Sequence, residues 1–136
     1  MNISGSCLCG SVTYSGVAEP VMAGNCHCID CKKASGSGYA PTLFFQESAL
    51  TINGDVKYFA KAGDSGKAVK RGFCPNCGSQ LFGKPDALPG LIAVRAGSLS
   101  ELSQFKPQID LYAGRAPAWD AMDPALPKFV EAPPMA

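Results

Sequence analysis

The sequence lacks a membrane-length apolar segment, a surplus of charge of one sign, and any second histidine or tryptophan. No window approaches the roughly 18 uncharged apolar residues that a membrane helix needs, and the first residues have neither the basic nor the apolar region of a secretory signal. Twelve Lys+Arg stand against 11 Asp+Glu, which disfavours nucleic acid as a partner. We therefore expect one cytoplasmic domain over residues 1–136, with no membrane or nucleic-acid partner and no oligomeric state indicated.

Cysteine, by contrast, is abundant. Seven cysteines cannot all pair as disulfides, and a reducing compartment disfavours such bonds in any case. Cysteines that serve only as small core residues would be scattered, whereas these are grouped at the spacing of metal ligands. The pattern therefore predicts metal binding by three groups: Cys7 and Cys9; Cys26, Cys28 and Cys31; and Cys74 and Cys77.

Two of these groups are predicted to share one zinc ion. Tetrahedral zinc takes four ligands, and two cysteines one or two residues apart supply two of them from one turn of backbone. Gly78 after Cys77 and Gly10 after Cys9 can each take a positive φ, which aims backbone N–H groups at sulfur. The favoured division is a closed, structural site of Cys7, Cys9, Cys74 and Cys77. The alternative division places Cys7, Cys9, Cys26 and Cys28 on one ion.

The middle group is one ligand short under the favoured division. Cys26, Cys28 and Cys31 lie within six residues and can converge on one ion from a single loop that runs into a short helix. A zinc ion with three protein ligands keeps a position for water or substrate, whereas four protein ligands leave it chemically inert. We therefore predict that these three cysteines form a catalytic zinc site.

The neighbours of this group have ordinary explanations. In an extended segment, side chains alternate in direction, so His27 is expected to face away from the metal and to be structural. Asp30 is expected to cap backbone amides. Lys32 and Lys33 are the nearest cations to the predicted open site, but two adjacent lysines are more often a solvated surface than a ligand-binding pair.

Secondary structure is predicted to be short and mainly extended, in a mainly β fold with one or two helical turns. Asn53-Gly54 is typical of a two-residue hairpin turn and predicts that residues 50–52 pair with residues 55–59. A short helix is expected over residues 28–35, with another helical turn within 98–105. The other expected strands are residues 10–16, 39–46, 68–73, 80–83, 91–96 and 109–112.

The end of the chain is predicted to be irregular. Five prolines after Arg115 make regular structure improbable. This segment is expected to wrap the surface with Trp119 and Phe129 as anchors and with a loose tail over residues 130–136.

The cysteine motifs resemble the family of glutathione-dependent formaldehyde-activating enzymes. Later segments resemble the family as well, including Gly97-Ser98-Leu99 and the closing Leu126-Pro127-Lys128-Phe129. The similarity runs from about Gly5 to Phe129. The segments that carry it most specifically are Cys7-Leu8-Cys9-Gly10, Cys26-His27-Cys28-Ile29-Asp30-Cys31 and Phe73-Cys74-Pro75-Asn76-Cys77-Gly78.

The resemblance implies a zinc-stapled β-tent fold with two zinc ions, one structural and one catalytic. It also implies a lyase activity: the reversible addition of a small thiol such as glutathione to an aldehyde such as formaldehyde, with Cys26, Cys28 and Cys31 as catalytic ligands. One departure stands out, because relatives often carry histidine where this chain has Asp110. If that position lines the pocket, the substrate is expected to differ.

A binding module without catalytic activity is the alternative, with both metals structural and the second completed by a partner. A methionine sulfoxide reductase on a related fold would need an exposed nucleophilic cysteine, and the clusters already use every cysteine. A closed site should not change its metal coordination when a thiol is added, which separates the binding module from the enzyme.

Overall fold

Short strands make up most of the regular structure. The computed structural model describes residues 1–132, and within them it contains ten strands and one α-helix. The prediction of a mainly β fold is therefore confirmed. The strands are β1 (Asn2–Ser6), β2 (Thr13–Val17), β3 (Met22–Cys26), β4 (Ala40–Gln46), β5 (Leu50–Asn53), β6 (Lys57–Ala62), β7 (Ala68–Phe73), β8 (Gln80–Pro85), β9 (Leu91–Arg95) and β10 (Ile109–Leu111).

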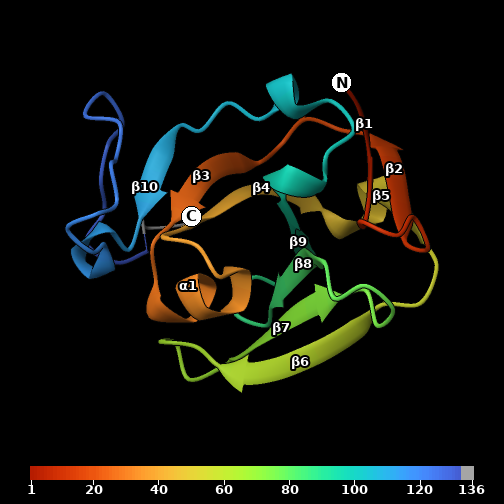
Figure 1. Cartoon of the computed structure of the whole chain (residues 1–136), viewed down its shortest axis with the longest axis horizontal. Coiled ribbons are helices and arrows are strands. Elements are labelled where there is room, and N and C mark those ends of the chain that lie inside the picture. Colours follow the sequence, from red (N-terminus) through yellow and green to blue (C-terminus); the bar gives the residue numbers. More distant parts are fainter. Residues whose placement is uncertain (133–136) are drawn as a thin grey trace.

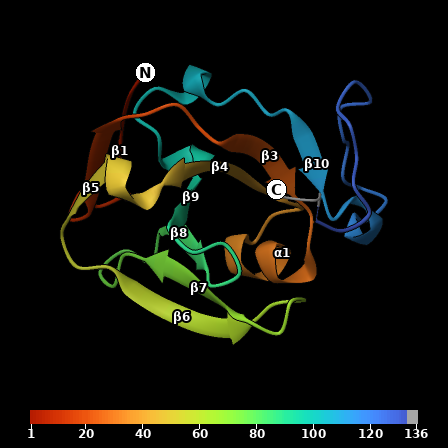
Figure 2. The ribbon, with the colours of Figure 1, turned by 180° about the vertical axis from the view of Figure 1, so that it is seen from behind.

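The strands form two sheets. One has three strands in the order β1-β2-β5, and the other has seven in the order β10-β3-β4-β9-β8-β7-β6. Every pairing is antiparallel except that of β10 with β3. The larger sheet is strongly bent, so that β3 and β4 lie on one side of the molecule and β6 and β7 on the other (Figures 1 and 2). The bend leaves room between the two arms of the sheet, and the helix lies there.

The predicted hairpin at Asn53-Gly54 is wrong. β5 pairs with β2, where Asn53 lies opposite Thr13, and β6 pairs with β7 in the other sheet. The turn residue itself behaves as expected, since Gly54 has a φ of 98°. A Cβ at this position would overlap the Ser11 carbonyl, so glycine is needed where the chain crosses from one sheet to the other. The local signal for a turn was real, but the partner of each strand was decided by the sheets.

The core lies on one face of the bent sheet, against the three-stranded sheet. Successive residues of a strand point to opposite faces, so Leu43 and Phe45 on β4 are fully buried on the core side while Thr42 and Phe44 face the other way. β9 alternates in the same manner. The buried core consists of Ile3, Cys7, Val12, Tyr14, Leu43, Phe45, Cys74, Leu81, Phe82, Ile92, Val94, Ala96 and Leu99.

Helical structure is confined to short pieces, as predicted. Helix α1 (Ile29–Ser35) ends at Gly36, which adopts a left-handed conformation with φ of 70°. Four 3-10 helices add single turns, and two of them fall at or within the predicted segment 98–105. They are Glu47–Ala49, Ala96–Ser98, Leu102–Gln104 and Ala113–Arg115. Within residues 1–132, no helix has the length and apolar character needed to cross a membrane.

The segment after Arg115 is irregular, as its prolines predict, but Trp119 is not its anchor. The indole is 72% exposed, and one edge of its ring lies over Gly38. The neighbouring Asp120 anchors the segment instead, through a buried contact with His27. Further along, Tyr112 N donates to the Glu131 carbonyl at 3.1 Å. Residues 133–136, the last part of the predicted tail, lie outside the described residues.

Candidate metal centres and active site

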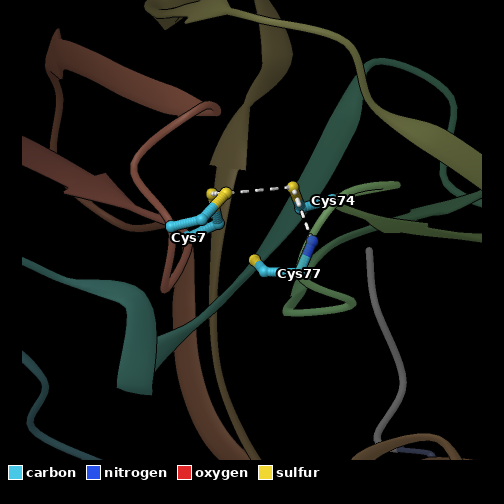
Figure 3. A group of neighbouring side chains, drawn as sticks. Cys7, Cys74 and Cys77 are labelled. Atoms are coloured by element: carbon cyan, nitrogen blue, oxygen red, sulfur yellow. Dashed lines mark hydrogen bonds between the residues drawn. The ribbon is translucent and has the colours of Figure 1, made fainter.

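The seven cysteines divide into a group of four and a group of three. Cys7 and Cys9 lie in the loop after β1, and Cys74 and Cys77 lie in the turn between β7 and β8. Their sulfur atoms all lie within 4.8 Å of one another. Figure 3 shows the side chain of Cys7 approaching those of Cys74 and Cys77 from the opposite side. The structure therefore groups these four cysteines, rather than joining Cys7 and Cys9 to the middle group.

The distances within the group of four fit a tetrahedral metal. Cys7 Sγ lies 3.6 Å from Cys9 Sγ, which lies 3.8 Å from Cys74 Sγ. Four sulfurs at a zinc–sulfur distance of about 2.3 Å would be separated by about 3.8 Å, whereas a disulfide requires about 2.05 Å. All of the cysteines are free thiols. The group can hold a metal ion, and it would link the smaller sheet to the bent one.

Two serines that the sequence analysis missed hold these sulfurs in place. Ser11 Oγ lies 3.0 Å from Cys9 Sγ and 3.2 Å from Cys74 Sγ. Ser79 Oγ lies 3.2 Å from Cys77 Sγ. The signal was present in the sequence, because each serine follows a Cys-Gly pair. These hydrogen bonds lower the pKa of Cys9 to about 7 and that of Cys77 to about 5, with Ser11 and Ser79 as the largest causes.

The backbone of this group follows the expectation from its glycines. Gly10 and Gly78 have φ values of 80° and 77°, the left-handed conformation that returns the chain toward the sulfurs. Val12 N donates to Cys7 Sγ at 3.3 Å, and Cys77 N donates to Cys74 Sγ at 3.5 Å. Backbone amides therefore donate hydrogen bonds to the sulfurs of Cys7 and Cys74.

The group of three is built by the junction of β3 and α1. Cys26 is the last residue of β3, Cys28 is the N-cap of α1, and Cys31 lies in the first turn of the helix. The N-cap contact joins two of them directly, since Cys31 N donates to Cys28 Sγ at 3.2 Å. The three sulfurs lie within 4.8 Å of one another, and among residues 1–132 no fourth ligand atom completes the group.

The three thiols of this group differ in pKa. Contacts with Cys26 and Cys28, followed by the positive charges of Arg95 and Arg71, hold the pKa of the Cys31 thiol far below its usual value. The pKa of Cys26 is raised by its contacts with Cys28 and Cys31 and by burial. The three thiols lie close together but differ in acidity. A divalent cation that bound all three as thiolates would remove this difference.

The group of three opens into a cavity of the part of the chain that the structure describes. Cys26, Cys28 and Cys31 line a cavity of about 650 Å³, whereas none of the four other cysteines does. This volume is within the range of about 300–1,000 Å³ that small-molecule sites occupy. The cavity lies on the face of the bent sheet that points away from the core. The strands of this sheet therefore lie between the two candidate metal centres.

Two arginines on this face were also missed by the sequence analysis. Arg71 on β7 and Arg95 on β9 line the cavity. Arg71 is 9% exposed, and its Nη2 lies 3.9 Å from Cys31 Sγ. Arg95 Nη1 donates to Thr42 Oγ1 at 2.6 Å. The strand pattern alone could have put both on the non-core face, but only the fold brings them beside cysteines that are far away in sequence.

His27 faces away from the cavity, as predicted. It is 1% exposed and absent from the cavity wall. Its Nδ1 contacts Asp120 Oδ2, and its Nε2 lies 2.9 Å from Asp110 Oδ1. Asp110 is equally buried and accepts a hydrogen bond from Lys128 Nζ at 3.1 Å. Asp110, where relatives often carry histidine, therefore belongs to a buried network behind the cysteines. This residue does not line the cavity.

The other predicted neighbours have clear positions. Asp30 does not cap the helix, because Cys28 fills that role and Asp30 Oδ1 instead accepts from Lys61 Nζ at 2.6 Å. Lys33 is exposed, and Lys32 Nζ donates to the Arg115 carbonyl. Neither lysine lines the cavity, which agrees with the expectation of a solvated surface.

Comparisons with known proteins agree with this architecture. A crystal structure of a Rhodobacter sphaeroides protein, a structural-genomics target, superposes with a TM-score of 0.54 at 23% identity, over 71% of this chain and 87% of that one. This likeness concerns the fold alone. A search of curated proteins finds no match. The family model for glutathione-dependent formaldehyde-activating enzymes matches residues 2–115, which include both cysteine groups. The chain therefore belongs to the family of glutathione-dependent formaldehyde-activating enzymes.

Proposed function

We propose that the protein is a zinc-dependent carbon–sulfur lyase that reversibly adds a small thiol, glutathione or a similar one, to an aldehyde such as formaldehyde. The observation that carries the proposal is the placement of Cys26, Cys28 and Cys31. Their sulfurs converge without a fourth protein ligand among the described residues, and they do so in the wall of a ligand-sized cavity. Family membership supports the same class of reaction.

The two cysteine groups would have different roles, one structural and one catalytic. Cys7, Cys9, Cys74 and Cys77 would hold one zinc ion with all four positions filled, which suits a structural role. Cys26, Cys28 and Cys31 would hold the second zinc ion. When bound there, zinc supplies an open position for the substrate thiol and lowers its pKa toward neutrality. We place the reaction in the cytoplasm, where thiols stay reduced.

The overall reaction forms one carbon–sulfur bond. The thiol proton leaves to solvent, the sulfur lone pair attacks the carbonyl carbon, and the carbonyl π electrons move to oxygen, which takes up a proton to become a hydroxyl. The reverse reaction breaks the same bond. The cavity contributes by holding both reactants close together between apolar walls that include Ile29 and Phe44. Arg71 and Arg95 present positive charge to the negative charge that moves from sulfur to oxygen.

The test is the substitution Cys28→Ser. We expect the zinc content to fall from two ions to one and the catalysed exchange between formaldehyde and its glutathione adduct, followed by nuclear magnetic resonance, to be lost. A Ser37→Ala variant serves as the control, because Ser37 is exposed and does not line the cavity. If Cys28→Ser keeps both ions and full exchange activity, the assignment is wrong.

A second measurement separates the enzyme from a zinc-stapled binding module. In protein loaded with cobalt, added thiol changes the visible spectrum only if it enters the metal coordination sphere. The proposal predicts this change in the wild type and its loss in Cys28→Ser. An unchanged wild-type spectrum would favour the binding module.

A further inference from the structure

The wall of the cavity carries two guanidinium groups whose hydrogen-bonding capacity is largely unused. Each guanidinium has five N–H donors, yet Arg71 makes one long contact with Cys31 Sγ, at 3.9 Å, and its buried Nε has no partner among residues 1–132. Arg95 has the hydroxyl of Thr42 as its only side-chain partner there. Within the described residues neither arginine forms an ion pair. A buried donor without an acceptor is costly, so these groups are suited to a ligand.

The strand register places both arginines on the face of the sheet that lines the cavity. Arg71 on β7 lies opposite Gly83 on β8, and Gly83 lies opposite Ala93 on β9, two residues before Arg95. A Cβ added to Gly83 would come within 3.8 Å of Arg95 Nη2. The missing side chain at Gly83 therefore leaves space beside Arg95, and an anion would stabilise the two positive charges that face the same cavity.

The acidic residues of the cavity do not supply that anion. Asp30 is paired with Lys61 at 2.6 Å. Asp64 interacts with Tyr112, where its negative charge helps to raise the pKa of the phenol to about 12, after the larger effect of burial. Thiolates of the cysteine group offer charge but no pair of oxygens. The planar fork of a guanidinium matches the two oxygens of a carboxylate, and a sulfur atom matches it poorly.

Resting on the proposed function, we infer that Arg71 and Arg95 form a carboxylate-binding subsite, so that one of the two reactants is a short acid. Because Arg71 Nη2 is 3.9 Å from Cys31 Sγ, the carboxylate must lie within a few bonds of the reacting atom. Two sources fit: a thiol acid resembling mercaptoacetate, or an aldehyde acid resembling glyoxylate. Both would place the acid on the arginines and the reacting atom at the three cysteines.

The thiol arm of the test uses binding to cobalt-loaded protein. Mercaptoacetate and 2-mercaptoethanol differ in the carboxylate, and the ratio of their dissociation constants is measured from the visible spectrum. We expect Arg71→Gln to reduce the preference for mercaptoacetate by about 10- to 100-fold, the factor typical of a lost charge-assisted hydrogen bond. Arg71→Lys keeps the charge and should retain part of the preference. Lys33→Gln is the control, since Lys33 is exposed and does not line the cavity.

The aldehyde arm compares the catalysed addition of 2-mercaptoethanol to glyoxylate with its addition to acetaldehyde, in the same variants. A preference for the acid that is lost in Arg71→Gln and kept in Lys33→Gln supports the subsite. The arm in which this happens identifies the reactant that carries the carboxylate. If both thiols bind cobalt equally well and neither arm shows such a preference, the subsite is refuted while the open metal site stands. If no thiol changes the cobalt spectrum, the proposed function itself fails, and the subsite fails with it.

Discussion

His27 Nε2 lies 2.9 Å from Asp110 Oδ1, and both side chains are 1% exposed. With Asp120 on the other ring nitrogen and Lys128 on Asp110, this network ties the strand that ends at Cys26 to the irregular end of the chain. Burial acts to raise the pKa of the Asp110 carboxyl, but its contacts with His27 and Lys128 outweigh that effect and lower it. The Asp110 carboxylate therefore joins His27 and Lys128 in a buried network behind the three cysteines.

Removing this carboxylate should be costly. Asp110→Ala would leave His27 and Lys128 facing a buried gap, and breaking a buried pair costs about 3–5 kcal/mol. The free energy of unfolding in urea at saturating zinc measures this loss. Asp86→Ala is the matched control, because its pair with Lys70 is half-exposed and is expected to contribute about 0–1 kcal/mol. Equal losses in the two variants would contradict the role given to Asp110.

Ser11 should tune the affinity of the four-cysteine site for metal. Its hydroxyl contacts both Cys9 and Cys74, and loss of such a contact from a metal ligand typically lowers affinity by about 10- to 100-fold. We expect Ser11→Ala to release one zinc ion to a competing chelator more readily, with the other ion unaffected. Ser103→Ala, at an exposed serine that contacts Glu101, should leave both ions unchanged. Release of both ions from Ser11→Ala to the same extent would be the contrary result.

Tyr14 contributes to stability at neutral pH, and this contribution is lost at high pH. Burial raises the pKa of its phenol, and the hydrogen bond with Ser98 lowers it by a smaller amount. A raised pKa in the folded state means that the contribution is fully present below the unfolded value of about 10 and is lost as pH rises through the folded value. Tyr14→Phe should therefore be less stable than wild type at pH 8, by about 1 kcal/mol for the lost hydrogen bond. That deficit should shrink or reverse at pH 11 in urea unfolding, and a constant deficit would argue against it.

Gly5 is required by the close approach of Tyr14. A Cβ at this position would overlap the Tyr14 hydroxyl and the Ser98 carbonyl. Gly5→Ala should therefore destabilise the protein by about 1–3 kcal/mol, the usual cost of overpacking. Gly97→Ala is the control, because nothing lies within 4 Å of its added Cβ. Thermal unfolding at fixed zinc concentration compares the two, and similar melting temperatures would show that Tyr14 can move aside.

Short-range patterns were sufficient for much of the fold. The glycines at Gly10, Gly36 and Gly78 take the left-handed conformations that their positions suggest, and most strands lie where alternation or apolar runs place them. The failures are long-range. The turn at Gly54 exists without its hairpin, and Trp119 is exposed while Asp120 is buried against His27. In both cases a partner distant in sequence outweighed the local preference.

The sequence by itself determined which atoms can bind metal, because cysteine spacing restricts which sulfurs can meet in one turn of backbone. In the structure the seven cysteines form one group of four and one group of three. Only the tertiary structure decided what surrounds each group. Pairing of β7, β8 and β9 carries Arg71 and Arg95 to the cavity beside Cys31, and the bend of the sheet puts the two cysteine groups on opposite faces. The physical reason is that alternation along a strand sets the face on which a side chain lies. The neighbours of that side chain depend on the order of the strands, which is set by packing between segments that are distant in sequence.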